Sequence, residues 1–213
     1  MTGPVLALET STLRASVALL GDGGELVGHW QQDPEKRGTA EVASIVRKQL
    51  GEAGISVQDL SGIAVGQGPG SYTGLRAGIA LARGLALAAA CPIVAVPSSA
   101  AAACAVLRSD AKLEKIIVLV DARRDEVYRA VYERGANEGA LLEVSPPRLA
   151  PSETDEPEGP PVTIIRDPIP DAYDVGVLGR PRLAEGGDDP ATVLPLYLKR
   201  SHAEMALEER ARS

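Results

Sequence analysis

A glycine-rich segment at residues 66–74, Gly-Gln-Gly-Pro-Gly-Ser-Tyr-Thr-Gly, has the composition of a loop that could bind an anion. It lies between a predicted strand and a predicted helix, so backbone N–H groups at the helix start could face a phosphate. The segment lacks the lysine of a Walker A loop and the spacing of the dinucleotide fingerprint. A second interpretation stays open, in which the glycines only permit a sharp turn and Ser71 or Thr73 caps the helix.

Two carboxylates end similar apolar runs, one in each half of the chain. Glu9 is followed by Thr10 and Ser11, and Asp121 is followed by the turn Ala-Arg-Arg-Asp at residues 122–125. A carboxylate at the first position could hold the magnesium ion of a bound nucleotide. The second turn has no glycine and its bulky side chains would fill a phosphate space, although its arginines could contact an anion. The candidates for a remnant nucleotide site are Glu9, Thr10, Ser11, Gly68, Gly70, Ser71 and Asp121.

Other kinds of catalytic chemistry lack the residues that they need. No Gly-x-Ser-x-Gly nucleophile segment occurs, and the two histidines, His29 and His202, fall in a predicted strand and in a charged tail. Cys91 and Cys104 have neither metal-site spacing nor the pattern of a disulfide framework. We therefore predict no catalytic residues, no metal site and a reducing, cytoplasmic location.

The composition disfavours nucleic acid and membrane as direct partners. The formal net charge is -7, no basic cluster exceeds a pair, phenylalanine is absent and aromatic residues make up 3% of the chain. The N-terminus lacks the basic start and apolar run of a signal peptide. Residues 78–96 carry Arg83 as their only charge, but an arginine in mid-span is costly in lipid. This stretch is better interpreted as a buried helix followed by a strand.

Hydrophobic periodicity predicts an α/β fold. The predicted elements of the first half are strands at 4–9, 14–20, 25–32, 62–66 and 92–96 and helices at 39–51, 73–90 and 98–108. The second half repeats the opening plan with strands at 116–121, 126–132 and 138–145, which suggests an internal duplication. We predict two tandem β-β-β-α-β-α lobes, at 1–108 and 109–213, the second one reduced.

The rest of the second half is predicted to be mostly irregular. Residues 146–190 are rich in proline and acids, which favours surface loops around one or two short elements such as 161–166. A last short strand at 193–200 would precede a charged helix or tail from His202.

Small residues recur every four positions along the helix predicted at 73–90, from Gly74 through Gly78, Ala82 and Ala86. Such a ridge lets another backbone approach closely, either within the fold or at a partner surface, and both interpretations remain open. On the second, Gly78→Glu would block pairing and leave the monomer folded. The candidate interface residues are Val42, Ile45, Val46, Gly74, Leu75, Gly78, Ile79, Ala82, Arg83 and Ala86.

Four segments resemble, in order and spacing, the signature segments of the TsaB (YeaZ) family. They are LALETSTLRASVALL at 6–20, GQGPGSYTGLRAGIALARGLALA at 66–88, VDARRDEVYRAVY at 120–132 and PLYLKR at 195–200. The resemblance implies an actin/hexokinase-like (ASKHA) fold and a non-catalytic paralogue of the transferase TsaD. It also implies a homodimer that alternatively pairs with TsaD through the first-lobe helices. With the ATPase TsaE, such a complex adds a threonylcarbamoyl group to the adenosine next to the tRNA anticodon.

On this resemblance, the chain would bind no cofactor tightly by itself, ATP and magnesium would act at the level of the complex, and tRNA would be contacted only indirectly. The chain departs from the family pattern at Glu9, where members usually carry aspartate, and at 39–41, where a His-Ser or His-Ala pair is usual. The alternative function is an autonomous ATP-dependent transferase or peptidase-like hydrolase of the same fold.

Overall fold

The first half of the chain forms a five-stranded sheet in the computed structural model, which describes residues 2–33, 41–136, 140–153 and 162–199. The strand order is β3-β2-β1-β4-β5, with β1 antiparallel to β2 and parallel to β4. The strands are β1 (Val5–Glu9), β2 (Ser16–Leu20), β3 (Leu26–Gln31), β4 (Gly62–Gly66) and β5 (Ile93–Val96). Every residue of β1 is buried, because alternate side chains point to opposite faces and helices cover both.

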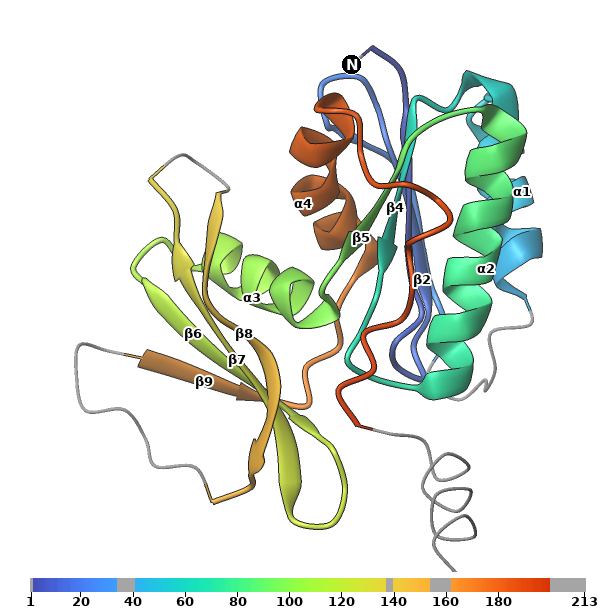
Figure 1. Ribbon diagram of the computed structural model, residues 1–213. Helices are drawn as coiled ribbons and strands as arrows, with labels where there is room; N and C mark the ends of the chain where they lie inside the picture. Colours follow the sequence, from blue (N-terminus) through green and yellow to red (C-terminus); the bar gives the residue numbers. More distant parts are fainter. Residues whose placement is uncertain (1, 34–40, 137–139, 154–161, 200–213) are drawn as a thin grey trace, which may run out of the picture.

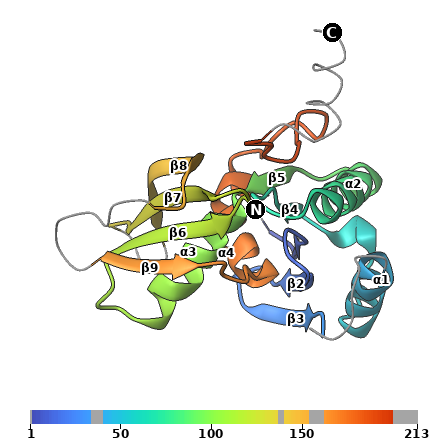
Figure 2. The same cartoon turned by 90° about the horizontal axis from the view of Figure 1, so that it is seen from below.

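Helices cover both faces of this sheet (Figures 1 and 2). The helices α1 (Val42–Glu52) and α2 (Tyr72–Ala89) pack on one face, where Leu6 and Leu8 belong to the same apolar cluster as Ile79. The helix α4 (Ala172–Ala184) packs on the other face, where Val175 clusters with Ala7. The 3-10 turn Val57–Asp59 precedes β4.

A second, four-stranded sheet has the order β8-β7-β6-β9. Its strands are β6 (Lys115–Asp121), β7 (Glu126–Arg134), β8 (Leu141–Pro151) and β9 (Val162–Arg166). The helix α3 (Ser98–Ser109) packs on this sheet through Ala103 and Leu107, and its Ala101 belongs to the core of the first sheet. Because α3 contributes to both cores, it joins the two sheets, as Figure 1 shows.

The predicted elements of the first half are confirmed in type and order, with ends that differ by a few residues. Thr39, the expected N-cap of the first helix, lies outside the described residues, and α1 begins at Val42 without a side-chain cap. In the second half the three opening strands are confirmed, and β8 extends to Pro151, six residues beyond the predicted end at 145. The strands divide between the two sheets at the predicted boundary near residue 108, and the division into domains stays a prediction.

Two predictions for the second half were wrong. Residues 172–184 form α4 instead of a surface loop, because this segment packs against β1, β2 and β4 of the first sheet. Residues 193–199 form no strand; they run as an extended segment that crosses from one sheet to the other. The tail predicted from His202 lies outside the described residues. Within the described part of the chain, no helix is long and apolar enough to cross a membrane.

Candidate functional site

The Glu9 carboxylate ends β1 and is completely buried. Its Oε1 accepts a hydrogen bond from the Ser11 backbone N–H at 2.6 Å, while Oε2 has no partner among the described residues. Burial raises the pKa of Glu9, and the hydrogen bond from the Ser11 backbone N–H opposes this rise in part. A Cβ at Gly66 would overlap this carboxyl group, so glycine is needed opposite it.

We expect Glu9→Gln to stabilise the protein increasingly as the pH rises above 4.5, the ordinary pKa of the group. With its pKa raised in the folded state, Glu9 favours folding most below pH 4.5, and this contribution is lost as the pH rises to the folded pKa. Glutamine is uncharged throughout this range and keeps an oxygen for the Ser11 N–H. Urea unfolding between pH 4 and pH 8 measures the difference. Glu114→Gln, at an exposed position, controls for the loss of one charge, and a difference for Glu9→Gln that does not change with pH would contradict the expectation.

The glycine-rich loop closes onto the turn after β1 instead of leaving its N–H groups free. The Ser71 N–H donates to the Ser11 carbonyl at 2.6 Å, and the Gly68 N–H donates to Ser98 Oγ at 3.0 Å. Ser71 Oγ accepts from the Gly74 N–H at 3.3 Å and so caps α2. These N–H groups are therefore bonded within the protein, which favours the interpretation of this loop as a turn and helix cap.

The start of α2 lies directly against the same turn. Thr10, fully buried, donates through Oγ1 to the Gly74 carbonyl at 2.8 Å. A Cβ at Gly74 would overlap the Thr10 carbonyl oxygen, and a Cβ at Gly78 would overlap Thr10 Oγ1. The two glycines therefore serve a close approach between a helix and a turn of the same subunit.

The space between Gly70 of this loop and the turn after β1 is too small for a nucleotide. A cavity of about 30 Å³ is lined by Ser11 and Gly70 on the first-sheet side, by Ser98 of α3 and by Val120 of β6. Ligand pockets typically have volumes of about 300–1,000 Å³, and about 30 Å³ is the share of one water molecule. The residues present do not fit a magnesium nucleotide in this closed arrangement.

Asp121 lies in different surroundings from Glu9, because its side chain is exposed. Its Oδ1 accepts from the Arg123 N–H at 2.8 Å, and its own N–H donates to Asp167 Oδ1 at 2.7 Å. These bonds shape the turn at 122–125, in which three consecutive residues have positive φ. No group of three or more His, Cys, Asp or Glu side chains among the described residues could hold a metal ion.

Most candidate interface residues lie inside the subunit, which corrects the prediction for them. Val42 and Val46 of α1 are at most 3% exposed. On α2 the buried positions are Gly74, Leu75, Gly78, Ile79, Ala82 and Ala86. Ile45 and Arg83 are half-buried. The ridge of small residues faces the sheet, so replacing Gly78 would disturb the fold and not a surface contact.

The opposite side of α2 is also built from small apolar residues, and it is exposed. We call Ala77, Ala80, Gly84, Leu87 and Ala88 the outer face of α2. Leu87 is 72% exposed, and a Cβ added at Gly84 would meet nothing within 4 Å. The three- and four-residue spacing of these positions was a signal in the sequence, but the buried ridge has the same spacing. Periodicity alone does not distinguish the two sides.

Residues 35–143, about half of the chain, match the family described as "TsaD: tRNA N6-adenosine threonylcarbamoyltransferase". The chain is 37% identical over 133 residues to the tRNA threonylcarbamoyladenosine biosynthesis protein TsaB of Escherichia coli, a match that covers 62% of this chain and 56% of that protein. It is 30% identical over 206 residues to an uncharacterised Mycobacterium tuberculosis protein, covering 93% of each chain. A Pseudomonas aeruginosa structure described as similar to peptidase YeaZ superposes with a TM-score of 0.82, at 29% identity, over 93% of this chain and 100% of that one.

The match to the E. coli protein spans only a little more than half of that protein's length. The α/β fold predicted from the sequence is confirmed by the two sheets and by the likeness to the P. aeruginosa structure. The family match covers the segments at 66–88 and 120–132, and the identity to TsaB agrees with the resemblance found in the sequence. The chain therefore belongs to the TsaD family, in its TsaB (YeaZ) branch.

Proposed function

We propose that this chain is a non-catalytic scaffold and dimerisation subunit in tRNA threonylcarbamoyladenosine biosynthesis, which binds and supports the catalytic subunit TsaD. The observation that carries the proposal is the closed site beside Glu9. At the cavity of about 30 Å³ beside Ser11 and Gly70, there is no room for the phosphates of a nucleotide, and the N–H groups of Gly68 and Ser71 are bonded within the protein. The family relationship supports a role in tRNA threonylcarbamoyladenosine biosynthesis. The small cavity beside Glu9 supports a non-catalytic role in that pathway.

The outer face of α2 is the surface that we assign to partners. It is apolar, exposed and made largely of small side chains, which allow a second helix to approach closely. We propose that a second copy of the chain and TsaD use this face in turn. This assignment replaces the buried side of α2 that the sequence suggested.

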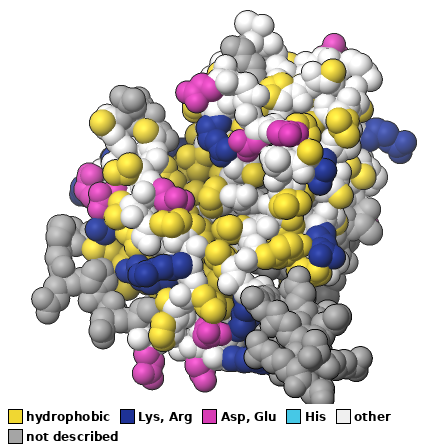
Figure 3. Space-filling model, viewed as in Figure 1, with side chains coloured by type: hydrophobic (Ala, Val, Ile, Leu, Met, Phe, Trp, Pro, Cys, Tyr) yellow, Lys and Arg dark blue, Asp and Glu magenta, His cyan; other side chains and the backbone are white. Residues whose placement is uncertain are grey.

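The contact with tRNA is proposed to be indirect. Figure 3 shows acidic, basic and apolar side chains mixed over the face in view, with no extended field of Lys and Arg. A chain with a net charge of -7 gains little from a phosphate backbone. We propose that TsaD carries the tRNA contact and that TsaE joins through the complex, in the cytoplasm.

The alternative function, a hydrolase or transferase of the same fold, is favoured by the peptidase likeness of the P. aeruginosa protein. The side chains described here offer little to such chemistry. Cys104 is buried, and burial raises the pKa of its thiol to about 11, so the thiolate nucleophile is scarce near neutral pH. The His29 ring Nε2 lies 3.0 Å from both carboxylate oxygens of Asp171, which also caps α4.

We expect calorimetric titration of the purified chain with Mg-ATP to give no binding heat at concentrations up to about 1 mM. The reason is that the cavity beside Ser11 and Gly70, where the sequence placed the remnant nucleotide site, has no space for a triphosphate. The same titration with TsaD and TsaE present is expected to give binding, because we place ATP and magnesium at the level of the complex. Micromolar binding by the chain alone would contradict the scaffold proposal and favour the autonomous enzyme.

A further inference from the structure

We infer that residues 192–199, here called the strap, hold the two sheets of this subunit at a fixed distance and orientation. The contacts of Lys199 with the second sheet are the ones on which this depends most. The strap follows the turn after α4 and runs along the lower part of the first sheet toward the second (Figure 1). It has anchors on the first-sheet side at three successive points and an anchor on the second-sheet side at its end. This role is separate from the partner-binding function proposed above.

The first anchors hold the strap to the first sheet and to α2. Val193 is 3% exposed and belongs to the apolar cluster between the sheet and α2. The Leu196 N–H donates to the Gln67 carbonyl at 2.8 Å, at the end of β4. The side chain of Val193 and the backbone of Leu196 therefore both hold the strap against the first sheet.

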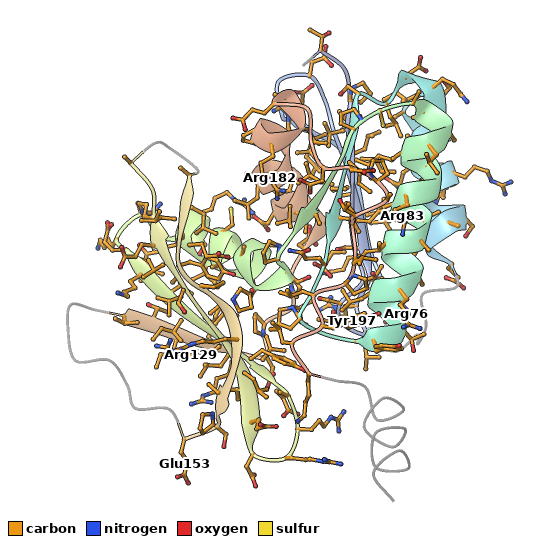
Figure 4. The ribbon with its side chains drawn as sticks, in the orientation of Figure 1. Arg76, Arg83, Arg129, Glu153, Arg182 and Tyr197 are labelled. Atoms are coloured by element: carbon orange, nitrogen blue, oxygen red, sulfur yellow. The ribbon has the colours of Figure 1, made fainter. Side chains whose placement is uncertain are left out.

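Tyr197 supplies a further anchor at the start of α2 (Figure 4). Its Oη accepts from Arg76 Nε at 2.8 Å, and its ring centroid lies 5.3 Å from that of Tyr72. The Arg76 guanidinium lies 4.0 Å from the centroid of the Tyr72 ring, so the two tyrosines and the arginine form a stacked cluster.

Lys199 makes the connection to the second sheet. Its Nζ donates to Glu126 Oε2 at 2.5 Å and to the Ala122 carbonyl at 3.1 Å, which places a cation against the turn between β6 and β7. In that turn Arg123, Arg124 and Asp125 have φ values of 64°, 59° and 58°. Left-handed backbone costs about 1 kcal/mol or more per residue that is not glycine. A half-buried ion pair with a carbonyl contact offsets part of this cost, so the turn and the strap stabilise each other.

The strap also lines a cavity between the two sheets. A cavity of about 640 Å³ is lined by Gln67 and Arg182 on the first-sheet side, by Tyr132 and Glu143 on the second, and by Val193 of the strap. Arg182 donates to the Ala95 carbonyl at 2.7 Å and pairs with Asp188 at 2.8 Å, which covers the open edge of β5 just before the strap begins. A cavity with walls on both sheets would change shape if the sheets moved, and the strap opposes that motion.

Electron–electron distance measurements between two spin labels test this inference. Labels are placed on the full chain at Ala43→Cys in α1 and Arg148→Cys in β8, both exposed and outside the outer face of α2, with Cys91→Ser to remove a half-buried thiol. Cys104 is buried with its pKa raised to about 11, so it reacts poorly with the label. The labelled chain with Lys199 unchanged is expected to give one narrow distribution of distances between the two labels.

Lys199→Met is expected to broaden this distribution, because methionine keeps much of the apolar stem and removes the charge. Lys112→Met, at an exposed lysine on the turn after α3, is the matched control and should leave the distribution narrow. In parallel, hydrogen exchange of the backbone amides at 122–126 should speed up on the order of tenfold in Lys199→Met and not in the control. Tyr197→Phe, which keeps the ring but loses the Arg76 bond, should show a smaller change of the same kind.

An unchanged distance distribution together with unchanged exchange in Lys199→Met would overturn the inference. If Lys199→Met fails to fold, Tyr197→Phe provides the test. A broader distance distribution in Tyr197→Phe would then support the inference, and a distribution as narrow as the parent's would overturn it. None of these readouts depends on TsaD, so a failure here is distinct from a failure of the proposed function.

Discussion

Gly78→Ala is expected to destabilise the protein by about 3 kcal/mol, whereas Gly84→Ala, six residues further along α2, is expected to be neutral or stabilising. The added methyl group at Gly78 would overlap Thr10 Oγ1, and Thr10 is held by its bond to the Gly74 carbonyl. At Gly84 the methyl group meets nothing within 4 Å, and alanine favours a helix over glycine by about 1 kcal/mol.

Urea unfolding of the two variants and the parent measures this difference directly. Both replacements add one methyl group to the same helix, so helix propensity contributes equally and the difference reports only on the surroundings. Equal stabilities for the two variants would show that the start of α2 does not lie tightly against the turn after β1. The same measurement separates the two sides of α2, of which the sequence pointed to the wrong one as a surface.

Ala80→Glu is expected to weaken both self-association and TsaD binding by about 100-fold or more, while the monomer stays folded. Ala80 is exposed on the outer face of α2, where the larger, charged glutamate side chain would hold a second helix away and would lose its hydration if that helix covered it. Sedimentation velocity measures the self-association, and urea unfolding checks the fold. Ala111→Glu makes the same change at an exposed position after α3 and should leave association unchanged. Self-association of Ala80→Glu as strong as that of the parent would show that the outer face of α2 is not the binding surface.

The first half of the fold could be predicted because its signals are local. The continuous apolar runs of β1 and β2, the glycines of the turns and the apolar period of α1 and α2 all lie within short windows of sequence. The repeat of the plan at β6 and β7 then predicted the second sheet.

The helix α4 could not be predicted in this way, because glycine and proline inside it contradict helix propensity. Gly176 lies against Leu20 and Ala7, and Gly179 lies against Ala64, so glycine here permits the helix to sit close to the first sheet. Packing against a distant part of the chain therefore overrides local preference. The N-cap Asp171, whose Oδ1 accepts from the Tyr173 N–H at 2.8 Å, was a local signal for this helix, together with Asp174 in its first turn and Arg182 in its last.

The candidate site was predicted only in part. The sequence brought Glu9, Ser11 and the glycine-rich loop together correctly, since strand ends on one edge of a sheet meet. It did not indicate that the Glu9 carboxyl is fully buried or that the Ser71 N–H bonds to Ser11, because such contacts depend on distances between segments some 60 residues apart in the sequence. It also could not tell which side of α2 faces the sheet, because both sides carry small residues at helical spacing.

In the proposed function, the chain acts by binding TsaD and not by catalysis of its own. Isothermal titration of purified TsaD from the same organism into the full chain tests this most directly. A one-to-one complex with a dissociation constant near or below about 10 µM, lost in Ala80→Glu and kept in Ala111→Glu, is the predicted result. Absence of binding by the parent chain at these concentrations, with both proteins folded, would contradict it.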